Sequence, residues 1–256
     1  MKRILLSSIV VALSIGLYAQ DGDNSSKEGK VVYEDVMKLD IKLEGAAAQF
    51  ADQLPKERRS KKELLFTENF SLYQNVKEDE SAEEVAMSGG GGMIQMKMME
   101  PDNQLFYDIE NSKTVEKREF MTRVFLIEND IKQGEWKITG DQKVILDYPC
   151  MQAVQENDEG KKTFAWFTPS IPIATGPSGY IGLPGLVLQV EMEDGDHTLT
   201  ALSIDFSEID KKLLVKPKKG KKVSQEEFDK IVADKMEEMG AEHKEGGATF
   251  MIQIKK

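Results

Sequence analysis

Four methionines that lie close together are the residues whose type best suits metal binding. Met93, Met96, Met98 and Met99 follow the four glycines at residues 89–92. Thioether sulfur is a soft ligand that suits Cu(I), and Met96 and Met98 would share one face of a strand. Methionine also fills gaps in ordinary apolar cores. We favour core packing over a copper site, and we expect no metal ion and no cofactor.

Cys150 is the only cysteine, and it could act as a nucleophile only beside a base. The two histidines, His197 and His243, stand in no motif that would provide that base. A single cysteine also excludes an internal disulfide. We therefore interpret Cys150 as a small buried hydrophobe. The chain contains no phosphate loop, dinucleotide fingerprint or nucleophile elbow, so the sequence predicts no catalytic residue.

Two charged runs could bind ions or partners. The acidic residues 78–84 lack the spacing of a calcium loop. A basic run in this acidic protein could bind anionic lipid headgroups or an acidic partner, although a solvated linker is the interpretation we favour. Its members are Lys211, Lys212, Lys216, Lys218, Lys219, Lys221 and Lys222.

Glycine and proline alternate through residues 172–185. The prolines fix φ and the glycines permit positive φ, so this pattern predicts a rigid loop of about 15 residues between two strands. The loop could be a structural corner or a contact site. The candidate contact residues are Tyr180, Gly182, Leu183, Pro184, Gly185 and Leu186.

The elements that must hold these residues are mostly strands. Asp194-Gly195 between residues 186–192 and 197–206 predicts a tight hairpin. We expect a flexible loop over residues 77–92 and a short helix over residues 45–54. Further strands are expected at residues 31–36, 61–76, 93–99, 104–109, 117–127, 136–138, 144–155, 163–168 and 248–254.

One helix is strongly indicated near residues 225–239. Ser224 and Glu227 form a capping box, and Gly240 could end the helix. Its apolar residues fall on one face, which should dock on a sheet. They are Phe228, Ile231, Val232, Met236 and Met239.

The composition is that of a globular protein, with 40% hydrophobic and 31% charged residues. Strands that recur roughly every ten residues favour an antiparallel sheet. We predict a mainly β fold: an antiparallel, strongly curved sheet or open barrel with one or two docked helices, similar to lipoprotein carriers by analogy only. Residues 31–256 would form a single domain.

The N-terminal residues have the anatomy of a secretory signal peptide. Lys2 and Arg3 precede an apolar stretch at residues 4–17, and Ala19 offers a small residue for cleavage. We predict a signal peptide over residues 1–19, a polar linker over residues 20–30, and a periplasmic or secreted protein. No apolar run reaches the roughly 20 residues of a spanning helix. The net charge of −11 argues against a nucleic-acid partner.

The Gly-Pro segment also carries a family resemblance. Residues 182–187 read GLPGLV, after Ile-Pro at 171–172, Gly-Pro at 176–177 and AWFT at 165–168. With Cys150, Ala153 and the opening GKVVYE at residues 29–34, this set resembles the GLPGLI family of Bacteroidetes. Val187 replaces the motif's last Ile, and Asp147 replaces a usual Gly, which makes a tight turn before Tyr148 less favourable. The resemblance implies a secreted or periplasmic protein and no mechanism.

Three functions remain open on these grounds. The favoured one is an exported, non-enzymatic binding or accessory protein of the cell envelope, which holds an apolar ligand or docks on an outer-membrane protein. The alternatives are an envelope copper-handling protein that uses the methionine cluster, and an unrecognised hydrolase built from carboxylates.

Overall fold

The computed structural model describes residues 27–43, 54–77, 83–89, 92–98, 100–132, 134–192, 195–242 and 250–253. The predicted leader, most of the linker and nearly all of the helix expected over residues 45–54 lie outside these ranges. The strands are β1 (Gly29–Lys38), β2 (Asp40–Leu43), β3 (Glu57–Phe66), β4 (Phe70–Asn75), β5 (Glu83–Gly89), β6 (Gly92–Met98), β7 (Gln104–Asp108), β8 (Lys113–Phe120), β9 (Arg123–Asp130), β10 (Lys137–Ile145), β11 (Tyr148–Glu156), β12 (Lys162–Thr168), β13 (Leu186–Met192), β14 (His197–Asp205), β15 (Lys221–Val223) and β16 (Phe250–Gln253). The helices are the 3-10 turn η2 (Pro177–Gly179) and α1 (Gln225–Glu242).

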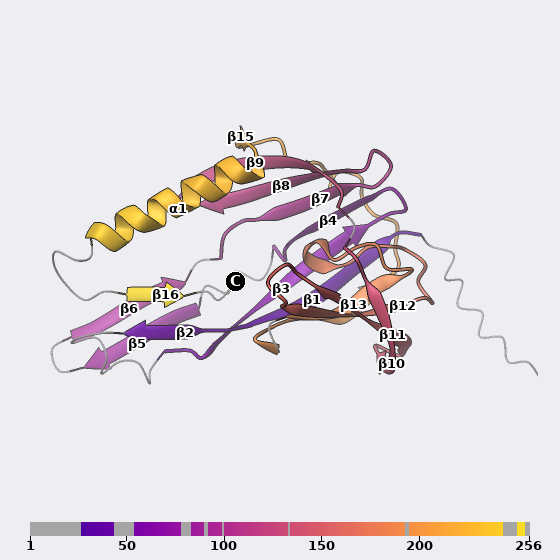
Figure 1. Ribbon diagram of the computed structural model, residues 1–256, viewed down its shortest axis with the longest axis horizontal. Helices are drawn as coiled ribbons and strands as arrows, with labels where there is room; N and C mark the ends of the chain where they lie inside the picture. Colours follow the sequence, from indigo (N-terminus) through magenta and orange to yellow (C-terminus); the bar gives the residue numbers. More distant parts are fainter. Residues whose placement is uncertain are drawn as a thin grey trace, which may run out of the picture.

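Twelve strands form one open sheet in the order β10-β11-β12-β13-β14-β1-β3-β4-β7-β8-β9-β15. Every neighbouring pair is antiparallel except β15 with β9. The N-terminal strand β1 lies at the centre, between β14 and β3. Figure 1 shows the sheet strongly bent, with β7, β8 and β9 turned over one side and β10 to β13 at the other end. The predicted mainly β, curved and open architecture is therefore confirmed.

Several strands are joined by tight turns whose residues have positive φ, the left-handed backbone conformation. The predicted hairpin of β13 and β14 is present, with Met192 opposite His197. Leu146 and Asp147 have φ of 50° and 65°, so they form a tight turn between β10 and β11 even though neither is glycine. Asparagine and aspartate tolerate this conformation better than most residues, which explains how Asp147 serves there.

Several predictions of local structure are wrong. The strands expected over residues 61–76 and 144–155 are each interrupted by a turn, the first between β3 and β4 and the second between β10 and β11. Residues 83–89 and 92–98, the first of which was expected to be part of a flexible loop, form the antiparallel hairpin of β5 and β6. The single strand expected over residues 117–127 is instead the end of β8 and the start of β9. Met121 and Thr122, with φ of 47° and 65°, make the turn between them. No glycine marks that turn, so the sequence pattern did not reveal it.

The buried apolar side chains of the described residues form three clusters. The first joins the centre of the sheet to the start of the Gly-Pro segment, for example Tyr33 and Leu64 to Ile171. The second lies between β12, β13 and the GLPGLV motif, where Leu183 packs with Phe167 and Val190. The third binds α1 to β9. The Gly-Pro segment is thus part of the core of the molecule.

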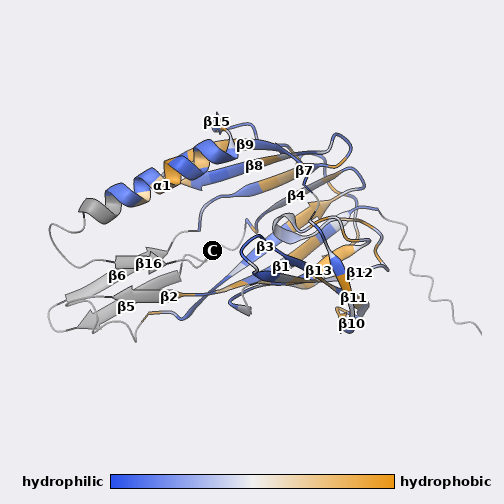
Figure 2. Cartoon of the chain, in the orientation of Figure 1, coloured by the Kyte–Doolittle hydropathy of each residue, from blue (hydrophilic) through white to orange (hydrophobic). Residues whose placement is uncertain are grey.

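Helix α1 begins at the capping box that the sequence predicts. The Ser224 backbone N–H donates to Glu227 Oε2 at 3.0 Å, and the Glu227 N–H donates to Ser224 Oγ at 3.1 Å. The helix runs to Glu242, so Gly240 does not end it. Figure 2 shows hydrophobic residues in the part of α1 next to β9. None of the described helices is long and apolar enough to cross a membrane.

Candidate functional site

The Gly-Pro segment folds as a corner between β12 and β13. Leu183 and Leu186 are 2% and 0% exposed, so their side chains belong to the core. Gly185 is buried as well, whereas Gly182 and Pro184 are exposed and Tyr180 is half-buried. Only part of the candidate contact loop is therefore open to a partner. Contact through Gly182, Pro184 and Tyr180 stays a prediction.

At two positions of this segment, another part of the backbone lies so close that only glycine, which has no Cβ atom, fits. Gly185 has a φ of +154°, and a Cβ atom there would lie 2.1 Å from the Thr168 carbonyl oxygen. Gly176 has an extended backbone, but its Cβ atom would lie 2.4 Å from the Tyr180 carbonyl oxygen. Gly182 has a φ of 90°, a conformation that glycine adopts more readily than other residues. This backbone conformation explains why a glycine stands at that position of the motif.

Side chains from distant strands hold the corner in place. The Trp136 indole donates to the Ile181 carbonyl at 3.0 Å, and the Tyr33 hydroxyl donates to the Val187 carbonyl at 2.7 Å. Thr175 Oγ1 donates to Ser71 Oγ at 3.2 Å in a buried contact. These hydrogen bonds tie the corner to β1, β4 and the residue before β10. The corner is therefore a rigid wall beside the neighbouring cleft.

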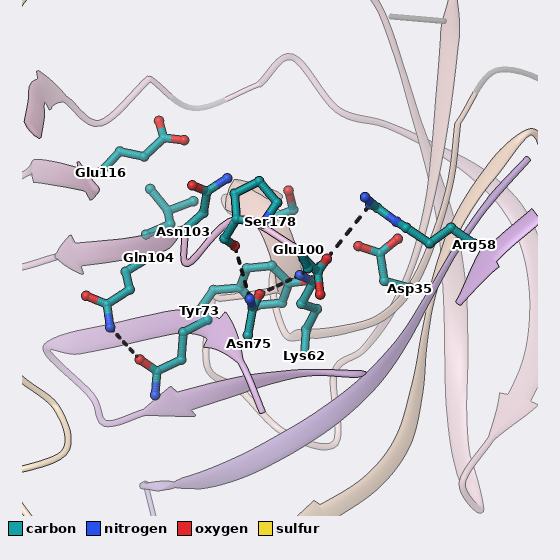
Figure 3. A pocket seen from close by; sticks show the side chains of 13 residues that line it. Asp35, Arg58, Lys62, Tyr73, Asn75, Glu100, Asn103, Gln104, Glu116 and Ser178 are labelled. Carbon is teal, nitrogen blue, oxygen red and sulfur yellow. Dashed lines mark hydrogen bonds and ion pairs between the residues drawn. The ribbon is translucent and has the colours of Figure 1, made fainter. Parts of the chain in front are cut away.

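A polar cleft of about 250 Å³ lies beside this wall (Figure 3). It is formed by β1, β3, β4, β7 with the segment that leads into it, β8, and Ser178 of η2. We call it the polar cleft. Its lining residues are Asp35, Arg58, Lys62, Tyr73, Gln74, Asn75, Glu100, Pro101, Asn103, Gln104, Leu105, Glu116 and Ser178.

Lys62 is the centre of the polar cleft. Along β3 it alternates in step with the core residues Leu64 and Phe66, and its own side chain is buried, with 8% exposed. Its ammonium donates to Asn75 Oδ1 at 2.6 Å and to Glu100 Oε1 at 2.5 Å. A buried ammonium is costly unless it is paired and hydrogen-bonded. Both conditions are met here, so Lys62 is a charged, fixed donor at the base of the cleft.

Glu100 gathers three donors around one carboxylate oxygen. Besides Lys62, Ser60 Oγ donates to Glu100 Oε1 at 3.2 Å, and an Arg58 terminal nitrogen lies 3.8 Å from it. Figure 3 shows the Arg58 and Lys62 side chains converging on Glu100 from separate positions of β3. The carboxylate is therefore held by ion pairs on the floor of the cleft.

Two polar atoms of the cleft are buried without a hydrogen-bond partner among the described residues: the Tyr73 hydroxyl and Arg58 Nε. Burial raises the pKa of Tyr73 well above its ordinary value, and the charges of Asp35 and Glu100 raise it further. The phenol thus stays neutral and can donate. Buried polar groups are nearly always paired with protein, water or ligand. These two donors can therefore satisfy acceptor atoms of a bound molecule.

Every carboxylate of the cleft has a nitrogen-bearing side chain as its neighbour. Asp35 Oδ1 lies 2.8 Å from His197 Nε2, and Glu116 lies 2.5 Å from Arg118 Nε. A general acid or base needs a carboxylate that can exchange protons at working pH. Glu100 and Glu116 are held by the cations Lys62 and Arg118, which favours binding over acid–base chemistry at these two carboxylates.

The sequence did not point to the polar cleft. Lys62, Tyr73 and Glu100 come from three separate segments, and none stands in a motif. One signal was available: Ser60 and Lys62 alternate in phase with Leu64 and Phe66. A lysine on the apolar phase of a strand indicates a buried charge that needs a partner.

The other candidate residues are placed as follows. Cys150 is buried at 1% exposure, and burial raises the pKa of its thiol, so it is poorly suited to act as a nucleophile. Met93, Met96 and Met98 lie on β6, opposite Ser88, Val85 and Glu83 of β5. Met99 and His243 lie outside the described residues. Within the described part of the chain, no group of three His, Cys, Asp or Glu could hold a metal ion.

A family model described as "Protein of unknown function (Porph_ging)" matches residues 154–189. The match includes AWFT at residues 165–168 and the GLPGLV motif. It is a match to a family of unknown function. It supports the resemblance noted above at that level, and it does not confirm the GLPGLI family itself. No curated protein matches the chain.

Solved structures show the fold. PNGF-II in the P21 and C2 space groups is similar, with a TM-score of 0.53 in both cases and identities of 15% and 16%. The likeness covers 80% of this chain and 32% of PNGF-II, so the chain spans about a third of that protein. An uncharacterized conserved protein from Thermus thermophilus has a TM-score of 0.39 and 7% identity, covering 79% of this chain and 93% of its own.

Proposed function

We propose that this chain is an exported, non-enzymatic binding protein of the cell envelope that holds a neutral, hydroxyl-bearing ligand, such as a saccharide, in the polar cleft. The observation that carries the proposal is the pair of buried, unpartnered donors, Tyr73 Oη and Arg58 Nε, at one cleft of the described part of the chain. Such donors suit the ring, hydroxyl or carbonyl oxygens of a ligand. The leader and the family resemblance support export.

The charges around the cleft argue for a neutral ligand. Two cations, Arg58 and Lys62, face three carboxylates, Asp35, Glu100 and Glu116. An anion would meet this carboxylate excess, and a cation would compete with ion pairs already formed. The amides of Asn103 and Gln104 add donors and acceptors that match hydroxyl groups. A polar ligand therefore replaces the apolar one expected from the sequence.

Isothermal titration calorimetry with a panel of neutral mono- and disaccharides tests this function. We expect one or more members to bind, and Tyr73→Phe to weaken that binding about tenfold, because one hydrogen bond to the ligand is lost. Tyr107→Phe is the matched control, since Tyr107 is a buried phenol on the neighbouring strand β7 that does not line the cleft. If no saccharide binds, or if both variants bind equally well, the proposal is wrong.

A further inference from the structure

The basic run between β14 and α1 is held against the sheet. Ile209 and Pro217 are buried, and β15 pairs with β9 from Lys221 to Val223. At Gly220, a Cβ atom would lie 3.0 Å from Leu126 Cγ, so the backbone itself is close to the sheet. The backbone that carries this run is therefore held against the sheet, while its lysine side chains are exposed as expected for a solvated segment.

This segment and the sheet enclose a groove of about 310 Å³. We call it the lysine groove. The lining contains six lysines, two glutamines, and no carboxylate from the described residues. The lining residues are Leu72, Gln74, Lys77, Gln104, Lys117, Lys212, Leu213, Val215, Lys216, Pro217, Lys218 and Lys219.

Five of the six lysines form no ion pair in the described part of the chain. Lys117 is the exception, because its ammonium lies 2.5 Å from Asp102. Two nearby carboxylates have other hydrogen-bond partners: Glu128 pairs with Lys222 and has a longer-range electrostatic interaction with Lys216, and Asp210 accepts the Lys212 backbone N–H. Unpaired positive charge is thus concentrated on one surface of a chain whose net charge is −11. Such a patch attracts anions.

Two large apolar side chains are exposed among these lysines. Leu213 is 49% exposed and Val215 is 47% exposed, and both line the groove. A small soluble anion would neutralise the lysines but would leave these two side chains in water. An anionic bilayer provides negative headgroups for the lysines and an apolar layer for Leu213 and Val215.

We propose that the lysine groove and its exposed apolar residues dock the protein on the surface of an anionic lipid bilayer. The mode is peripheral: the lysines contact headgroups while Leu213 and Val215 enter the interface. Each lysine near an anionic membrane adds to the affinity, and the effect is screened by salt.

Co-sedimentation with vesicles tests the proposal. The purified protein should bind vesicles of phosphatidylcholine mixed with phosphatidylglycerol, bind pure phosphatidylcholine vesicles much more weakly, and be released by high salt. Changing Lys216, Lys218 and Lys219 together to glutamine should lower the partition coefficient on the order of a hundredfold. The control changes three exposed lysines that do not line the groove, Lys56, Lys137 and Lys162, to glutamine, and it should bind almost as wild type does.

A second variant tests the apolar contribution. Leu213→Ser with Val215→Ser keeps every charge, and it should weaken vesicle binding while leaving the melting temperature unchanged. Equal binding to both kinds of vesicle would overturn the proposal. So would binding of inorganic phosphate by a protein that does not bind vesicles, or equal losses in the groove and control triple variants.

Discussion

At the scale of single residues, removal of the Tyr73 hydroxyl should weaken ligand binding without lowering the stability of the protein. It is buried and has no hydrogen-bond partner among the described residues. Removing an unpaired buried hydroxyl relieves a desolvation penalty of about 1–3 kcal/mol. We expect Tyr73→Phe to leave the unliganded protein at least as stable as wild type. Urea denaturation without ligand measures this, and a clear loss of stability would show that the hydroxyl has a structural partner.

Gly185 provides a second prediction at this scale, because a Cβ atom there would meet the Thr168 carbonyl oxygen at 2.1 Å. Neither group is a flexible side-chain end that could move aside. We expect Gly185→Ala to destabilise the protein by more than about 2 kcal/mol.

Gly140 is the matched control for Gly185. It has a φ of +95° and nothing within 4 Å of an added Cβ atom, so Gly140→Ala should cost only the roughly 1 kcal/mol of backbone strain. Urea denaturation compares the two variants. Equal losses would mean that conformation, and not close approach, explains the motif glycine.

Single residues also show which parts of the site the sequence could predict. The Gly-Pro pattern predicted a rigid corner, because proline and glycine act on the local backbone. The polar cleft depends on Lys62, Tyr73 and Glu100, which meet only after β3, β4 and the segment before β7 are assembled. Their contacts are tertiary, so no local pattern could place them together.

At the scale of elements, α1 should depend on one anchor. Phe228 is 6% exposed and meets Phe125 edge-on at 5.3 Å, whereas Met236, on the same predicted apolar face, is 56% exposed. We expect Phe228→Ala to cost about 3 kcal/mol or more and to reduce the helical circular dichroism signal. Met236→Ala should change stability by less than about 0.5 kcal/mol. Similar effects of the two substitutions would contradict this docking mode.

The capping box gives α1 a second, smaller contribution. Ser224→Ala removes the hydroxyl that accepts the Glu227 N–H, and it should cost about 1 kcal/mol. Ser203, which is exposed on β14, is the control position for the same substitution. Guanidinium denaturation of the two variants makes the comparison. An equal effect at both positions would mean that the cap contributes nothing.

Elements were predicted best where the local signals agreed. The β13–β14 hairpin and the start of α1 follow from turn and capping residues, and both are present. The β8–β9 turn at Met121 and Thr122 was missed because neither residue type favours positive φ. The acidic and glycine-rich composition of residues 77–92 suggested a loop, but pairing between β5 and β6 overrides that composition.

At the scale of the whole molecule, two adjoining surfaces of different chemistry share Gln74 and Gln104 in their linings. Arg58, Lys62 and Glu100 contribute opposing charges to the polar cleft beside the Gly-Pro corner. The lysine groove has unpaired positive charge and lies under the segment that leads to β15. In the proposed scheme, one surface holds a soluble ligand while the other keeps the protein on a membrane.

The proposed function places the protein in the cell envelope, which requires export, and export is itself a prediction from residues 1–19. Signal peptidases cleave after a small residue, and Ala19 provides one after the apolar stretch. N-terminal sequencing of the protein from its native envelope should therefore begin at Gln20. Ala19→Arg should block processing, so that the exported fraction keeps the mass of the uncleaved chain. Ser14→Ala, inside the apolar stretch, is the control and should be processed normally. A native protein that begins at Met1 and stays in the cytoplasm would remove the basis for an envelope function, while the stability predictions for Gly185, Phe228 and Ser224 would still apply.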